Sequence, residues 1–107
     1  MMYIDDLGEI IAVRKFGFVD DEKAKIEVRV GKPRPFDESS GWYCPFQIVG
    51  IGGEEIKYAA GVDAMQSLQT VMVLIGATLE YFNGQVNDQL RWEGSTEKDL
   101  GFPVMKS

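Results

Sequence analysis

The sequence predicts an α+β fold with two layers: an antiparallel meander sheet of four strands, or slightly more, and one long helix packed on one face. Three observations predict this fold. The first half of the chain carries short stretches rich in β-branched and aromatic residues, separated by turn residues. One long amphipathic stretch follows, and no second stretch of helical periodicity has a comparable length. A chain of 107 residues, 45% of them hydrophobic, suffices for a single domain over residues 1–107, with a core at about residues 9–104.

The first two strands are predicted at residues 9–19 and 24–30. Residues 9–19 are rich in β-branched and aromatic side chains, but both faces of this stretch are apolar, so either face could be the buried one. Residues 20–23 are acidic and polar, which indicates a turn. Residues 24–30 alternate charged side chains with apolar ones, as in a strand with one solvated face, and the apolar set is Ile26, Val28 and Val30. Residues 31–41 contain two prolines among glycine, serine and acidic residues, so they indicate a loop.

Two further strands are predicted before the helix. Residues 42–51 are mostly apolar and predict the third strand. Pro45 is in conflict with this strand, because it cannot donate to a ladder. It therefore implies an edge, a bulge, or pairing that begins after it. Gly52 and Gly53 predict a tight turn, from which residues 54–60 return as the fourth strand.

The long amphipathic stretch spans residues 61–84 and predicts the helix. Asp63 stands before the apolar run and Gln66 three residues later, which is the spacing of a capping box. Asn83 and Gly84 tolerate a left-handed backbone and predict the end of the helix. One wide apolar face is predicted to lie on the sheet, and it comprises Ala64, Leu68, Val71, Met72, Ile75, Leu79 and Phe82.

Two short patterns follow the helix. Residues 89–93 alternate apolar and polar side chains, which predicts a short strand or an extended segment. Leu100, Phe102 and Val104 stand around a glycine and a proline. They indicate a tail that packs on the core.

The composition disfavours several classes of function. The formal net charge is −6, and phosphate contacts need clustered lysine and arginine, so we expect no nucleic-acid partner. The N-terminal residues are acidic and lack the apolar segment of a secretory signal, so we expect no such signal. The unbroken apolar run in the helical stretch, residues 71–75, is far shorter than the roughly 20 residues that span a membrane. We therefore expect no membrane partner. A single cysteine, Cys44, excludes an internal disulfide and fits a reducing compartment, so we expect a cytoplasmic protein.

The sequence offers little for catalysis. It contains no histidine, which removes Ser-His-Asp and Cys-His catalysis and most zinc sites. Cys44 lacks a histidine base and stands in an apolar strand, so we interpret it as a packed structural cysteine. Carboxylate clusters at residues 20–22, 37–38 and 54–55 lack the spacing of a calcium-binding loop and are interpreted as solvated turns. We therefore predict no catalytic residue, no metal site and no cofactor, and a protein that is not an enzyme.

Three motifs resemble a known family. Residues 42–48 read W-Y-C-P-F-Q-I, residues 61–68 read G-V-D-A-M-Q-S-L, and residues 99–103 read D-L-G-F-P. Over residues 10–104 the sequence resembles a family of small uncharacterised bacterial domains, in which a W-x-C-P-[FY]-x-I strand precedes G-V-D-[AS]-x-Q-[AS]-L at the start of a helix. The resemblance implies a bacterial, cytosolic, single-domain protein. That family carries no established activity or cofactor, so the resemblance adds no catalytic residue.

The first functional hypothesis is a non-enzymatic protein-interaction module. An acidic, histidine-free chain of this size suits the binding and blocking of a basic protein, as immunity proteins and antitoxins do. Salt would then weaken the complex. The predicted contacts lie in two acidic loops and comprise Asp20, Asp21, Glu22, Asp37 and Glu38.

The alternative is a small-ligand-binding domain, with a pocket between sheet and helix near Trp42, Cys44 and Gln66. The capping-box spacing already explains Gln66, and packing explains Cys44. An enzyme that uses carboxylates alone is a third hypothesis, although no motif brings two acidic residues to one site. Edge strands and an open sheet face also allow self-association as a homodimer.

Overall fold

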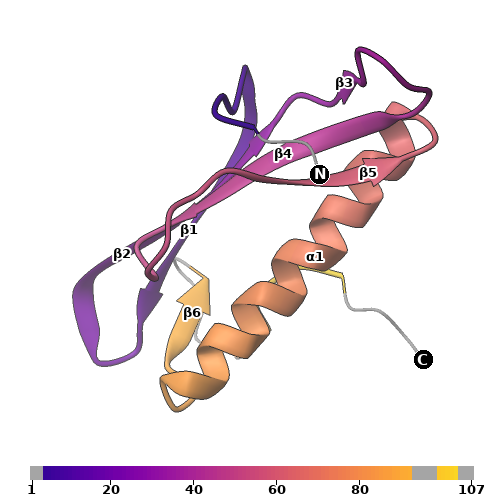
Figure 1. Ribbon diagram of the computed structural model, residues 1–107. Coiled ribbons are helices and arrows are strands. Elements are labelled where there is room, and N and C mark those ends of the chain that lie inside the picture. The colour runs from indigo at the N-terminus through magenta and orange to yellow at the C-terminus, as the bar shows by residue number, and fades with distance from the viewer. Residues whose placement is uncertain (1–3, 93–98, 104–107) are drawn as a thin grey trace.

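The computed structural model describes residues 4–92 and 99–103, apart from the side chains of Glu22 and Ala24 (Figure 1). One long helix packs on an antiparallel sheet of six strands, so the predicted α+β class is confirmed. In chain order the elements are β1 (Ile10–Phe18), β2 (Asp21–Gly31), β3 (Arg34–Pro35), β4 (Trp42–Val49), β5 (Lys57–Gly61), α1 (Ala64–Gln85) and β6 (Leu90–Trp92). In the part of the chain that the structure describes, no helix is both long and apolar enough to cross a membrane.

The sheet is a meander whose last strand returns to its first. β1, β2, β4 and β5 follow one another, each antiparallel to the next, and β6 pairs with β1. Trp42 pairs with both β3 and β5, and Phe46 pairs with both β2 and β5. β2 and β3 therefore share one edge of β4, and β5 occupies the other. The segment at residues 31–41, predicted as a loop, thus contains one two-residue strand.

Pro45 lies in the middle of β4 at a break in the ladder. β2 pairs with β4 from Phe46 onward, whereas β3 pairs only with Trp42 and Tyr43. Pro45 therefore falls in the gap between these two ladders, and its partner on the opposite edge is Tyr58 of β5. Of the three alternatives that the sequence leaves open for Pro45, the third is correct on the side of β4 that faces β2: the pairing begins after the proline.

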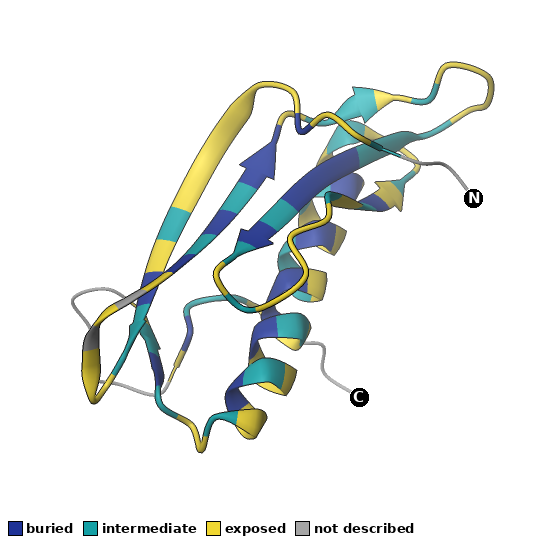
Figure 2. Ribbon diagram, turned by 60° about the vertical axis from the view of Figure 1, so that its left-hand side comes forward, coloured by how far each residue is buried: buried dark blue, intermediate teal, exposed yellow. Residues whose placement is uncertain are grey.

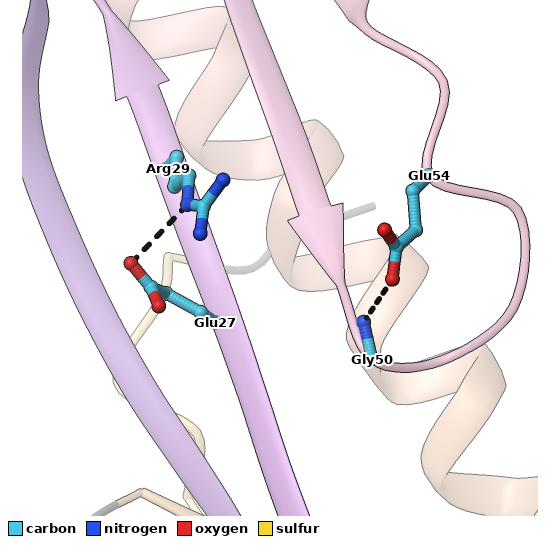
Figure 3. Close-up of polar contacts among 4 residues, drawn as sticks. All are labelled: Glu27, Arg29, Gly50 and Glu54. Atoms are coloured by element: carbon cyan, nitrogen blue, oxygen red, sulfur yellow. Dashed lines mark hydrogen bonds and ion pairs between the residues drawn. The ribbon is translucent and has the colours of Figure 1, made fainter.

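The predicted tight turn at residues 52–53 is wrong, because residues 50–56 form one wide loop and β5 starts later than predicted. The Glu54 side chain closes this loop: its Oε2 accepts the Gly50 N–H at 3.0 Å (Figure 3). The Glu54 backbone carbonyl accepts from Gln47 Nε2 at 2.7 Å. Side-chain hydrogen bonds, rather than the backbone bonds of a two-residue turn, therefore set the length of this connection.

α1 begins where the sequence predicts. Asp63 Oδ1 accepts the Gln66 N–H at 2.8 Å, and Gln66 Oε1 accepts the Val62 N–H at 2.6 Å. The two side chains bond the backbone reciprocally across the first turn, in the manner of a capping box. Both side chains are otherwise exposed, so helix capping accounts for their contacts.

α1 ends later than predicted. Asn83 and the glycine after it are helical, and the left-handed backbone occurs instead at Asn87 and Asp88, with φ of 57° and 59°. The Asn83 side chain instead bonds a residue that follows the helix. Its Oδ1 accepts the buried Leu90 N–H at 2.9 Å. Asn83 therefore holds the turn that leads into β6.

The core lies between α1 and one face of the sheet (Figure 2). On the sheet it comprises Phe16, Ile26, Val28, Val30, Cys44, Phe46, Ile48 and Ala59. On α1 the buried residues are Ser67, Val71, Ile75, Gly76, Leu79 and Asn83. Leu68, Met72 and Phe82 of the predicted face pack at the rim of this core. The helix thus packs the branched side chains of Val71, Ile75 and Leu79 against the sheet.

The segments that flank the core complete the fold. β1 turns Phe16 inward and leaves its N-terminal half exposed (Figure 2), which decides the face that the sequence leaves open. Leu100 is buried, and the Phe102 ring stacks on Phe16 with centroids 6.3 Å apart, so the predicted tail packs on the core. Val104 lies outside the described residues. On the sheet face away from α1, Glu27 and Arg29 form an ion pair of 3.2 Å (Figure 3).

Candidate functional site

A groove of about 480 Å³ lies beside the C-terminal half of α1. The helix, the turn after it and the segment at residues 99–103 form its walls. Its lining combines acidic, amide and apolar side chains, and comprises Gly76, Glu80, Asn83, Asp88, Asp99, Leu100 and Phe102. Gly76 permits the close approach of this segment, because a Cβ there would stand 3.0 Å from Phe102 Cβ.

Three carboxylates give the groove a negative charge. Glu80, Asp88 and Asp99 are exposed, and no ion pair among the described residues engages any of them. Asp99 Oδ1 accepts the Gly101 N–H at 2.7 Å, which holds that side chain at the groove. The last turn of α1 carries no basic residue, so the negative end of the helix dipole adds to the same potential. The charged side chains that line the groove are therefore all negative, while the Arg91 and Arg14 guanidinium groups bond the carbonyls of Asp88 and Gly101 next to it.

Asn83 supplies a hydrogen-bond donor to the same groove. Its side chain is 7% exposed and its Oδ1 is engaged by the Leu90 N–H. No hydrogen bond among the described residues uses its Nδ2 as a donor, and this nitrogen is not sealed from solvent. A bound group with a carbonyl oxygen can therefore accept from Asn83 Nδ2. Leu100 and Phe102 provide the apolar surface next to it.

The charges of the groove do not form a metal site. Within residues 4–92 and 99–103, no three aspartate, glutamate or cysteine side chains gather closely enough to hold a metal ion. The three carboxylates come instead from separate segments and line a space large enough for an amino-acid side chain and its backbone. This arrangement suits an extended cationic group better than a single ion.

The structure divides the predicted acidic contacts between two ends of the molecule. Asp20 and Asp21 are exposed at the turn between β1 and β2, at the same end as the groove (Figure 1). Gln89 directly follows the groove residue Asp88. In the orientation of its amide that places the nitrogen toward this turn, Gln89 donates to Asp20 Oδ2 at 2.9 Å. The Glu22 side chain lies outside the described part of the chain.

The other two predicted contacts lie away from the groove. Asp37 and Glu38 are exposed in the loop between β3 and β4, at the opposite end of the molecule (Figure 1). The five acidic residues therefore do not form one surface. A partner that fits the groove lies near Asp20 and Asp21 but not near this second loop.

The residues of the predicted ligand pocket do not line the groove. Cys44 is fully buried in the core, and its Sγ–H donates to the Gly31 carbonyl at 3.3 Å. Gln66 is exposed and caps α1, and Trp42 is half-buried at the start of β4. These positions agree with the packing and capping roles expected of Cys44 and Gln66. The pocket near these three residues stays a prediction.

Cys44 is expected to be unreactive in the folded protein. Burial raises the pKa of its thiol from the ordinary value of 9.0 to about 11, so at pH 8 little thiolate forms. A thiol reagent should label Cys44 slowly in buffer and rapidly in denaturing urea, whereas an added surface cysteine, Thr70→Cys, should react at once. Since the unfolded thiol ionises first, the free energy of unfolding should fall as pH rises from about 9 to 11. Rapid labelling of the folded wild type would contradict the burial of this thiol.

Sequence reasoning missed the residues that form the groove. Gly76, Glu80 and Asn83 stand at helical spacings of four and three residues, so they share one stripe of α1. This stripe is a signal in the sequence, but Asn83 has the residue type of a helix end, and Glu80 lies outside the predicted apolar face. Asp88 and Asp99 gave no signal, because only the packing of the final segment brings them to this stripe.

The comparisons with known proteins point to one family. No curated protein matches the chain, and no solved structure matches it. Residues 12–104 match the model of a family described as a domain of unknown function, DUF6968. This match confirms the resemblance to an uncharacterised family, and its bounds lie close to those expected from the motifs. The chain therefore belongs to the family of domains of unknown function DUF6968.

Proposed function

We propose that this protein is a non-enzymatic interaction module of the bacterial cytosol, and that its groove binds a basic segment of another protein. The observation that carries the proposal is the meeting of three carboxylates, an available amide donor and an apolar surface in one groove. Each of these features matches a different part of a basic peptide. Binding and blocking a basic protein, as an immunity protein or antitoxin does, is the activity that this groove would serve.

The chemistry of a lysine or arginine side chain fits the groove in three ways. Its charged end would face the carboxylates of Glu80, Asp88 and Asp99, none of which forms an ion pair among the described residues. Its aliphatic stem would pack on the Phe102 ring, since long basic side chains cover apolar surface in this way. A backbone carbonyl of the bound segment would accept from Asn83 Nδ2.

The overall charge supports the same kind of partner. The chain carries a formal net charge of −6, so a basic protein is attracted at long range and then positioned by the groove. The raised pKa of Cys44 and the lack of histidine in the sequence favour binding over nucleophilic catalysis. The interaction is therefore expected to depend strongly on ionic strength.

The proposal is tested with a fluorescent oligolysine peptide and two matched variants. The groove variant Glu80→Gln/Asp88→Asn keeps the shape of both side chains and removes two charges. The control variant Asp37→Asn/Glu38→Gln removes two charges from the distant loop, so both variants have the same net charge. The groove variant should weaken binding about tenfold, or about 1.4 kcal/mol, and the control should bind almost as the wild type does.

Two results would contradict the proposal. Equal weakening in both variants would mean that net charge alone attracts the peptide, without a specific groove. Wild-type binding that is unchanged between low and high salt would mean that the contact is not electrostatic. If only the groove variant binds the peptide more weakly, the same two variants can then be used to identify the natural partner in a lysate of the host. That partner is the basic protein that the control variant retains and the groove variant does not.

A further inference from the structure

β5 is the last strand on its side of the sheet, and its outer edge is unpaired among the described residues. The register of β5 on β4 is continuous over all five residues of β5, without a bulge. On the other side of β5, no strand and no backbone hydrogen bond of the described residues engages it. Figure 1 shows β5 at the margin of the sheet. An edge of this kind is a template for a further strand.

Pro45 shows which backbone groups of β5 face this edge. Pro45 is the partner of Tyr58 and has no N–H, so the two residues cannot exchange both bonds of a hydrogen-bonded pair. The N–H and C=O of Tyr58 therefore face away from β4. Because these groups alternate along a strand without a bulge, those of Ala60 also face outward, and those of Gly61 face β4. The Gly61 carbonyl agrees with this alternation, since a Cβ on Gly41, next to the start of β4, would stand 3.1 Å from it.

We propose that β5 pairs antiparallel with β5 of a second copy of this chain, about a two-fold axis at Ala59. In this register Tyr58 lies beside Ala60 of the second copy, twice by symmetry. Each of these two pairs exchanges two backbone hydrogen bonds, so the dimer gains bonds from outward groups that no described residue uses. An axis at Tyr58 would instead need a residue before β5. An axis at Ala60 would need the Val62 N–H, which already donates to Gln66 Oε1 at 2.6 Å.

The side chains of β5 suit a copy of the same strand. Tyr58 is half-buried and Ala60 is exposed, and both stand on the sheet face away from α1, opposite to the buried Ala59. The Tyr58 ring of each copy therefore packs beside the small Ala60 of the other. Lys57 is the one charged residue of β5, and it lies beside Gly61 of the second copy. No like charges therefore face each other along the paired strands.

α1 brings little charge to the joined sheet. A two-fold axis perpendicular to the sheet keeps both α1 helices on the same side of it. α1 has one charged residue in 22, Glu80, while Met65 and Leu74 are 66% and 39% exposed. Contact between two such helices would cover apolar side chains without bringing clusters of like charge together. Because a strand of five residues is small against the roughly 800 Å² per partner of a standard interface, the dimer is expected to be reversible.

The proposal is tested by sedimentation velocity over a concentration series, with thermal unfolding to check that each variant is folded. The wild type should show a reversible dimer. Ala60→Pro removes the outward N–H but no bond to β4, so each of the two pairs loses one hydrogen bond and dimerisation should weaken at least about tenfold. Ala60→Lys keeps the backbone groups, places a charge against Tyr58 of the second copy and should weaken dimerisation to a similar extent.

Val19→Lys is the matched control for these variants. It places the same charge at a 59% exposed residue in the turn between β1 and β2 and should leave the dimer intact. A wild type that stays monomeric, or a dimer unaffected by a folded Ala60 variant, would overturn the proposal.

A short bismaleimide tests whether the two β5 edges meet. In the proposed register the two Ala60 residues are diagonal neighbours across the axis, roughly 7–8 Å apart. The reagent should therefore link Ala60→Cys into a covalent dimer and leave Val19→Cys monomeric, while the buried Cys44 of both variants reacts slowly. If Ala60→Cys forms the dimer in sedimentation but is linked no faster than Val19→Cys, the copies meet elsewhere and the pairing of β5 is wrong.

Discussion

Ile75→Ala is expected to lower the free energy of unfolding by about 2–5 kcal/mol. Ile75 is fully buried at the middle of α1, between the helix and the sheet. Removal of its side chain takes apolar contacts from both layers and leaves a cavity that the stiff β-strands cannot close. Urea unfolding followed by circular dichroism measures the loss.

Two neighbours on α1 serve as controls for this substitution. Leu68 is half-buried at the rim of the core, so Leu68→Ala should cost less than Ile75→Ala. Leu74 is 39% exposed on the adjacent side, and Leu74→Ala should cost least. Equal losses at the three positions would contradict the placement of the buried stripe of α1.

Gly61→Ala is expected to lower the free energy of unfolding by about 3 kcal/mol, because the added Cβ forces apart the end of β5 and the start of α1. A Cβ on Gly61 would stand 2.8 Å from the backbone carbon of Gln66 and closer still to the Ser67 nitrogen. That nitrogen makes the first backbone hydrogen bond of the helix, to the Asp63 carbonyl at 3.1 Å. Neither backbone segment can rotate away as a flexible side chain would. Thermal unfolding measures the effect.

Gly53→Ala is the matched control for this prediction. A Cβ on Gly53 would meet no atom within 4 Å, so its stability should stay within about 1 kcal/mol of the wild type. If Gly61→Ala is as stable as Gly53→Ala, the close approach of β5 and α1 is wrong.

Local sequence signals predicted the elements of the fold well. Asp63 and Gln66 placed the start of α1, because capping is decided within a few residues. The alternation at residues 24–30 lies within β2, which starts at Asp21, inside the predicted turn, and residues 89–93 contain β6. The sequential strands also indicated the meander, since short connections join antiparallel neighbours.

Longer-range contacts explain what the sequence could not predict. Glu54 closes the loop at residues 50–56 through Gly50, and no local rule distinguishes this from a two-residue turn. Asn83 is a residue type that often ends helices, but here it is helical and its side chain accepts a hydrogen bond from the buried Leu90 N–H. The groove is less predictable still, because it needs Asp99 and Phe102 to return to α1 from beyond the last strand.

The most direct test of the proposed groove is an amide NMR titration of the ¹⁵N-labelled protein with oligolysine at low salt. The groove predicts that the Asn83 side-chain amide and the backbone amides of Glu80, Asp88 and Leu100 shift together with one dissociation constant. These shifts should disappear at high salt. Shifts confined to the loop that holds Asp37, or no shifts at all, would contradict the groove as the binding site.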